Sequence, residues 1–172
     1  MQAHTRAFLV LSHAEIESYL EDWAKDVARA CEAVWTKSGR PTKPLAFLLA
    51  TYVERISVPQ KLGKEDGPQK LAHATKQLFQ AYYELIKANH GIKEQNVMAL
   101  FFPLGIPASA FGSTLLPNLD SLGALRGTHA HLSAQAVASV LDPETQFNKI
   151  TAIVGDLKTL DAWLVEYRRS IR

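Results

Sequence analysis

An arginine and a histidine stand five positions apart in the segment RGTHAH, at Arg126 and His131. A guanidinium group can hold a phosphate through two parallel hydrogen bonds, and an imidazole changes charge near pH ~6.5, so it can move protons under neutral conditions. Together the two side chains could bind a phosphodiester and assist its cleavage. The spacing alone is weak evidence, because Arg6 and His13 also match an arginine and a histidine with four to six residues between them.

The neighbours of the pair are more informative when the segment is drawn as a helix that turns about 100° per residue. His129 then falls in the middle of an apolar face, which favours a core histidine with one hydrogen-bond partner, and Arg126 falls at its edge. His131 points about 140° away from Arg126. The apolar face consists of Leu119, Leu122, Leu125 and Leu132.

The face around His131 carries small residues, namely Ala124, Gly127 and Thr128. Each glycine inside this helix, at 123 and at 127, costs about 1 kcal/mol relative to alanine. A sequence that accepts this cost gains room for the close approach of another backbone or of a ligand. We therefore predict that this face meets a second subunit, a substrate or both, and that the protein is a homodimer built on these small residues.

Apolar residues at helical spacing predict the elements that carry this segment. A first long helix is expected over 4–35, with the stripe Ile16, Leu20, Trp23, Val27, Cys31 and Val34. Further helices are expected over 45–56, over 70–90 with Gly91 as its C-terminal cap, over 92–102, and from the N-cap Asn118 to 141. Between the last two, residues 103–117 are rich in proline and glycine and predict a loop.

The final helix is expected to begin at the cap Asp142 and the proline that follows it. Its apolar seam runs from Ile150 to Ile171 in steps of three and four, and the first helix is its expected antiparallel partner. The sequence therefore predicts an all-α fold, an up-and-down helical bundle of about five to six helices, in a single domain over 1–172. The tail arginines Arg168, Arg169 and Arg172 suit the end of this helix, and a second interpretation is that they help to hold the phosphodiester substrate.

Composition excludes several classes of protein. The chain has 172 residues, of which 47% are hydrophobic and 21% charged, with a net charge of +2, so it is neither disordered nor strongly basic. The single Cys31 excludes an internal disulfide, no phosphate-binding glycine loop is present, and His129 and His131 diverge too far on a helix to chelate a metal. No apolar run is long enough to span a membrane. We expect a soluble cytoplasmic protein without cofactor or metal, whose remaining histidines (His4, His13, His73 and His90) lie at the surface or an interface.

Three stretches, FLVLSHAEIESYLEDW, GIKEQNVMALFFPLGI and LDSLGALRGTHAH, occur in this order. Together they resemble the HEPN superfamily, and most closely its RiboL-PSP-associated branch, over most of the chain. Members with an intact R-x4–6-H motif are typically metal-independent endoribonucleases. Many are defence effectors, or toxins that an antitoxin protein restrains. Their active site forms where two protomers meet. The resemblance implies that Arg126 and His131 are the motif residues, that Ala130 precedes the motif histidine and that Glu17 is the first-helix acid.

In this scheme Arg126, His131 and Glu17 are the catalytic residues, and Thr128 and His129 contact the RNA. Glu17 has a second interpretation as an ordinary solvated acid. Two residues depart from the family pattern: Gly127 stands where a polar residue usually follows the arginine, and Ser133 stands where a related branch has a tyrosine.

Two other interpretations remain beside the ribonuclease. One is a non-catalytic HEPN module that binds RNA or a nucleotide, and the other is a structural bundle that recognises another protein through its small-residue face. His131 discriminates among them, since the ribonuclease alone needs it for proton transfer.

Overall fold

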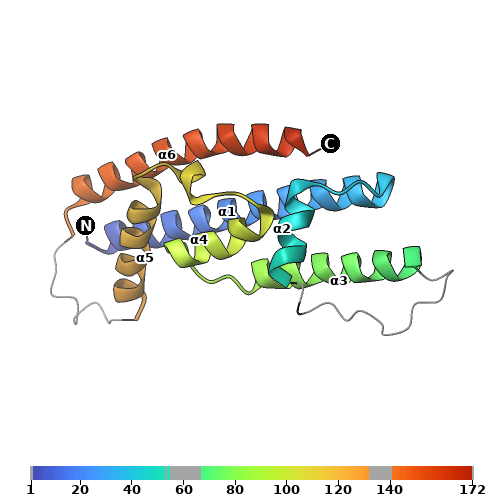
Figure 1. The fold of residues 1–172 in the computed structure, drawn as a ribbon. Coiled ribbons are helices and arrows are strands. Elements are labelled where there is room, and N and C mark those ends of the chain that lie inside the picture. The colour runs from blue at the N-terminus through green and yellow to red at the C-terminus, as the bar shows by residue number, and fades with distance from the viewer. Residues whose placement is uncertain (1, 53, 55–66, 132–140, 172) are drawn as a thin grey trace.

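The computed structural model describes residues 2–52, 54, 67–131 and 141–171, and for residues 68, 69 and 126–131 it describes the backbone alone. The predicted all-α fold is confirmed, because these ranges hold α-helices and short 3-10 helices and no strand (Figure 1). The elements are α1 (Gln2–Ser38), α2 (Lys43–Tyr52), α3 (Gly67–Lys87), α4 (Glu94–Phe101), the 3-10 helices η2 (Phe102–Leu104) and η3 (Ala108–Phe111), α5 (Leu115–His131) and α6 (Pro143–Ser170).

The long helix α1 is the element against which the others pack. At about 1.5 Å per residue its 37 residues extend over roughly 55 Å. The predicted stripe faces the core: Ile16, Leu20, Val27 and Cys31 are buried, and Trp23 and Val34 are half-buried. The helix ends at Ser38 because Gly39 adopts a left-handed conformation (φ +65°), with its N–H on the Trp35 carbonyl at 2.7 Å, and Pro41 follows.

α6 packs along α1, as predicted, but it runs parallel to α1 instead of antiparallel. The side-chain amide of Gln2 donates to the Leu141 carbonyl (2.8 Å), the Tyr19 hydroxyl donates to Asp161 (2.9 Å), and Asp26 pairs with Arg168. Because residue numbers rise together along both helices, the helices run parallel (Figure 1). The antiparallel prediction is therefore wrong, because α5 lies across the long helices and the chain re-enters the bundle beside the start of α1.

α3 runs antiparallel to α1, as three contacts show. Trp35 donates to Thr75 (3.0 Å) and Tyr83 donates to Glu32 (2.7 Å), while Asn89 reaches back to Glu21 (3.1 Å). The helix ends at Lys87, three residues earlier than predicted. Its end is a turn in which the Asn89 N–H donates to the Ile86 carbonyl (3.0 Å), so the predicted cap Gly91 lies beyond it and has another function, described below.

The proline- and glycine-rich stretch between α4 and α5 is more regular than the predicted loop. It forms η2 and η3, and Gly105 ends η2 in a left-handed conformation (φ +73°) beneath the ring of Phe47. α5 then begins at Leu115, so the prediction of Asn118 as N-cap is wrong. The Thr114 carbonyl accepts the first helical hydrogen bond, from the Asn118 N–H (3.1 Å). Pro117 is tolerated within the first turn, where an N–H has no partner inside the helix.

The first residues of α6 match the prediction. The Asp142 carboxylate accepts a hydrogen bond from the Thr145 N–H (2.8 Å), as an N-cap does, and Pro143 occupies the first turn. Hydrogen bonds from the Thr145 side chain and backbone hold the pKa of Asp142 below its usual value. The seam is confirmed as well: Ile150, Ile153, Leu157, Leu160 and Leu164 are all buried.

Asp161 fixes the register of α1 and α6, because one of its oxygens accepts from both the Tyr19 hydroxyl (2.9 Å) and the Trp23 indole N–H (3.0 Å). Asp161→Ala should lower the free energy of unfolding by about 1–3 kcal/mol, since both half-buried donors lose their acceptor. Urea denaturation measures the change. Asp22→Ala, at a side chain that is 70% exposed, is the control and should change stability by less than about 0.5 kcal/mol. Equal losses in the two variants would contradict this role.

Candidate functional site

Helix α5 carries the predicted motif in its last turns, because its helical backbone extends to His131. The side chains of Arg126, Thr128, His129 and His131 lie outside the described residues, as do the predicted contact at Gly127 and the face residue Leu132. The beginning of the helix agrees with the helical drawing. Leu119 and Leu122 are buried, Leu125 is half-buried and lines a small hollow with Leu9 of α1, and Ala124 is exposed.

At Gly123 the helix packs closely against side chains of the same chain. A Cβ atom at this position would stand 3.0 Å from Cγ of Lys93 and 3.8 Å from Cγ1 of Ile92. One turn earlier, the Asp120 carboxylate accepts a hydrogen bond from the Glu94 N–H (2.6 Å) at the start of α4. α5 is therefore held against residues 91–94, which comprise the end of the connection from α3 and the first residue of α4.

The other side of the same segment is held by Glu17 on α1. One carboxylate oxygen of Glu17 accepts a hydrogen bond from the Gly91 N–H. The other lies 3.6 Å from Nδ1 of His13, which is too long for a hydrogen bond. The Glu17 side chain is 18% exposed, so it is fixed in place and is not the freely solvated acid of the second interpretation.

Asn89 completes the attachment of this segment to α1. Its side-chain amide donates to Glu21 (3.1 Å) and to the Gly91 carbonyl (3.1 Å). Lys25 lies 3.8 Å from the same Glu21 carboxylate. We call residues 89–94 the connecting segment, because Glu17 and Glu21 hold it to α1 while Asp120 and Gly123 hold it to α5. The structure therefore brings Glu17 and the motif helix α5 to one short stretch of backbone.

Two residues of this cluster were assigned differently from sequence. His13 was expected at the surface or an interface, yet its side chain is 2% exposed. It lies four positions after the buried Leu9 and three before the buried Ile16, so the apolar stripe of α1 already contained the signal. Because it is buried, it can hold Glu17 in place but cannot touch a substrate in solvent. Asn89 was missed because no periodic pattern marks a residue in a turn.

The other chemical features lie away from this cluster. Among the described residues, no group of three or more His, Cys, Asp or Glu side chains could hold a metal ion, and none of their helices is long and apolar enough to cross a membrane. Burial raises the pKa of the Cys31 thiol, which keeps it protonated and unreactive at neutral pH.

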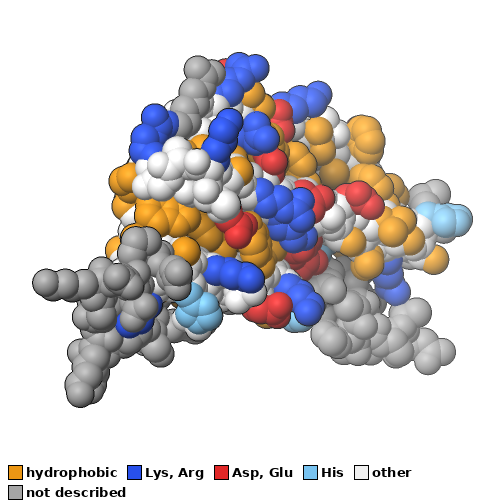
Figure 2. Space-filling model, turned by 90° about the vertical axis from the view of Figure 1, so that its right-hand side faces the viewer, with side chains coloured by type: hydrophobic (Ala, Val, Ile, Leu, Met, Phe, Trp, Pro, Cys, Tyr) orange, Lys and Arg blue, Asp and Glu red, His pale blue; other side chains and the backbone are white. Residues whose placement is uncertain are grey.

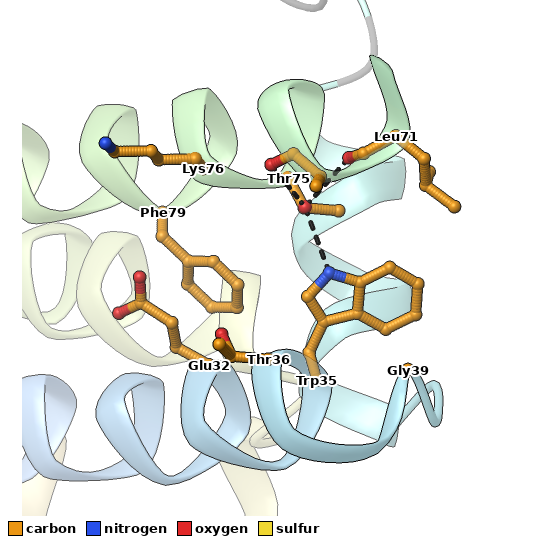
Figure 3. A pocket seen from close by; sticks show the side chains of 9 residues that line it. Glu32, Trp35, Thr36, Gly39, Leu71, Thr75, Lys76 and Phe79 are labelled. Atoms are coloured by element: carbon orange, nitrogen blue, oxygen red, sulfur yellow. Dashed lines mark hydrogen bonds between the residues drawn. The ribbon is translucent and has the colours of Figure 1, made fainter. Parts of the chain in front are cut away.

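A hollow of about 580 Å³ opens between α1 and α3 (Figure 3). Trp35, Leu71 and Phe79 give it apolar walls. Two of its polar groups are engaged within the fold, since Thr75 accepts from Trp35 and Glu32 accepts from Tyr83. The hollow contains none of the predicted site residues.

Glu17→Ala should lower the free energy of unfolding by about 1–3 kcal/mol, because the partly buried Gly91 N–H loses its acceptor. Glu17→Gln keeps an oxygen there and should cost less than about 1 kcal/mol. Glu15→Ala, an exposed acid two positions away on α1, is the matched control. Urea denaturation of the three variants tests the contact, and an alanine variant as stable as the control would contradict it.

Comparison with known proteins places this fold in a family. The family model described as RiboL-PSP-HEPN matches residues 1–160, which include all of α1 to α5 and most of α6. No curated protein and no solved structure matches the chain. The match agrees with the resemblance found in the three sequence stretches and with the all-α bundle. The chain belongs to the RiboL-PSP-HEPN family.

Proposed function

We propose that this protein is a metal-independent endoribonuclease that acts in the cytoplasm as a toxin or defence effector. The observation that carries the proposal is an intact R-x4-H pair, Arg126 and His131, on α5 and inside the range matched by the family model. A restraining antitoxin protein is the partner that such an activity implies.

The proposed reaction uses the nucleophile that RNA itself carries. The 2′-oxygen attacks phosphorus as its proton is removed, and the bond to the 5′-oxygen breaks as that oxygen gains a proton. The His131 imidazole serves as general base or general acid for these transfers. The Arg126 guanidinium stabilises the additional negative charge on the phosphate in the transition state. The products are a 2′,3′-cyclic phosphate and a 5′-hydroxyl, and Thr128 and His129 contact the RNA.

Glu17 acts in this proposal as a positioning residue. It holds the Gly91 N–H, and the connecting segment contacts α5 at Asp120 and Gly123. A shift of Glu17 would therefore displace the helix that carries Arg126 and His131. Glu17→Gln, which keeps the acceptor, should reduce cleavage much less than Glu17→Ala.

The proposed enzyme is a homodimer. Arg126 and His131 diverge by about 140° on one helix, too far for both to hold one phosphate, whereas a two-fold dimer places two such pairs around one cleft. The proposed contact comprises Ala124, which is exposed, together with Gly127 and Thr128. Light scattering should give a particle of twice the chain mass of 19.0 kDa. A particle of 19.0 kDa at assay concentration would refute the dimer.

The cleavage test uses total RNA and tRNA in excess EDTA, with the ends of the products mapped. The wild type should cut and leave cyclic phosphate ends. Arg126→Ala and His131→Ala should lower the rate by at least about 100-fold, the lower range for losing a general acid–base or an electrostatic group. Circular dichroism shows whether each variant is folded.

A folded wild type that does not cut, or cutting that survives in His131→Ala, would refute the ribonuclease. The non-catalytic module that binds RNA or a nucleotide would then be the better interpretation, and Gly127 in place of a polar residue favours it. RNA binding that His131→Ala weakens without any cleavage would identify that module. If His131→Ala changes neither cleavage nor RNA binding, the remaining interpretation is a structural bundle that recognises another protein.

A further inference from the structure

A row of aromatic rings with a lysine in its middle lies where α2, η2 and the end of α6 meet. The rings of Trp163 and Tyr167 are stacked, with centroids 5.1 Å apart and an interplanar angle of 12°. Phe47 and Phe102 pack edge to face at 6.3 Å. Between the two pairs stands Lys43, whose Nζ lies 5.4 Å from the Tyr167 centroid and 5.8 Å from that of Phe47. We call these five residues the aromatic–basic surface.

Two rings of this surface are exposed to solvent although they are large and apolar. Phe102 is 55% exposed and Phe47 36% exposed, while Trp163 is half-buried. Phe47 packs over Gly105 and Tyr167 donates its hydroxyl to the Leu104 carbonyl (2.6 Å), so both have a structural role. Phe102 makes its edge contact with Phe47 and leaves most of its ring in water. A large aromatic side chain held in this way is available for stacking.

Lys43 lies against two aromatic rings but forms no ion pair with a described carboxylate. Its Nζ contacts two aromatic rings, and among the described residues no carboxylate forms an ion pair with it. By contrast, Arg168 pairs with Asp26 and Arg169 with Glu166. The rings of Phe47 and Tyr167 attract the Lys43 ammonium group, and its charge stays accessible to a partner that brings a negative group.

Lys43 stands at the edge of a hollow, and the two arginines near the end of α6 are partly exposed. Arg168 and Arg169 are 47% and 62% exposed, and Lys43 and Tyr167 line a hollow of about 210 Å³ between the start of α2 and the end of α6. Figure 2, which faces the right-hand side of Figure 1, shows Lys and Arg side chains beside hydrophobic ones across its upper part, with acidic side chains among them.

We propose that the aromatic–basic surface binds a single-stranded stretch of RNA, with a phosphate on Lys43 and a base stacked on Phe102. A cation between aromatic rings is the combination that binds single strands without sequence preference, because every base has a face that can stack and every linkage carries a charge. The choice of RNA over another polyanion rests on the proposed function.

The surface is separate from the proposed cleavage site. α5 packs beside Ile150 near the start of α6, whereas Tyr167 lies near its end. At 1.5 Å per residue the two positions are roughly 25 Å apart along the helix. Figure 1 shows α5 beside the first turns of α6 and α2 toward its C-terminal part. A long RNA could therefore contact both, whereas a dinucleotide at the cleavage site could not.

The test measures binding of a fluorescein-labelled, 12-nucleotide 2′-O-methyl oligouridylate by fluorescence anisotropy. Its capped 2′-oxygen cannot attack phosphorus, so the readout does not depend on cleavage. Phe102→Ala should raise Kd at least about fivefold through loss of stacking. Lys43→Gln should raise Kd and reduce the slope of log K against log salt by about 0.7, the value for one phosphate contact on a single strand.

Two variants serve as matched controls. Leu11→Ala removes an exposed apolar side chain (64% exposed) from α1, and Lys87→Gln removes an exposed lysine from the end of α3. Both should bind like the wild type. Thermal unfolding by circular dichroism should show all four variants folded.

The proposal fails if Phe102→Ala and Lys43→Gln bind the oligonucleotide as the controls do. It also fails if they lose binding to phosphatidylserine vesicles and not to RNA, since the surface would then face a membrane. Oligonucleotide binding that depends on both residues in a protein that cuts no RNA would support the surface while refuting the ribonuclease. If cleavage depends on His131 but oligonucleotide binding does not depend on Phe102 or Lys43, the ribonuclease is supported and the RNA-binding surface is refuted.

Discussion

Burial of one apolar stripe along α1 is the constraint on which the rest of the structure depends. Several neighbours bury the stripe together, since α3, α5 and α6 all pack against the same helix. α1 therefore serves as a common axis, and each neighbour is positioned by what it contacts there. A displaced α1 would disturb every other element together.

Apolar burial does not by itself fix the register of these contacts, because leucines three and four residues apart pack almost as well after a shift. Partly buried polar groups fix it. Asp161 accepts from two donors on successive turns of α1, and Glu17 accepts one backbone N–H of the connecting segment. A shift by one turn would leave these donors without acceptors, and an unmet donor away from water is costly. The same contact that sets the register also holds the backbone next to the motif helix.

The sequence predicted what depends on periodicity and missed what depends on direction and on turns. The stripe of α1, the seam of α6 and the cap at Asp142 follow from local spacing and were correct. The parallel course of α6 could not be read locally, since a helix seam fits a partner of either direction. Gly91 was assigned as a cap because glycine follows many helices, whereas here its N–H is committed to Glu17.

For the candidate site, Glu17 could be singled out from sequence, but its partner could not, because the two are separated by 74 positions in the chain. The apolar periodicity of α1 indicates that His13 is buried, whereas an isolated histidine in a sequence suggests a solvated side chain. The aromatic–basic surface combines residues from three elements, and no spacing within the sequence joins them.

The parallel arrangement of α1 and α6 has an electrostatic consequence. The peptide dipoles of two helices that run side by side in one direction add, so both negative carbonyl ends, at Ser38 and Ser170, point the same way along the bundle. Lys37, Arg168 and Arg169 stand in the last turns there, where they offset that field. Part of the positive charge at this end of the molecule thus serves the fold itself. Lys43, at the start of α2, lines the same hollow as Tyr167 and Ser170, so it too stands beside the carbonyl end of α6.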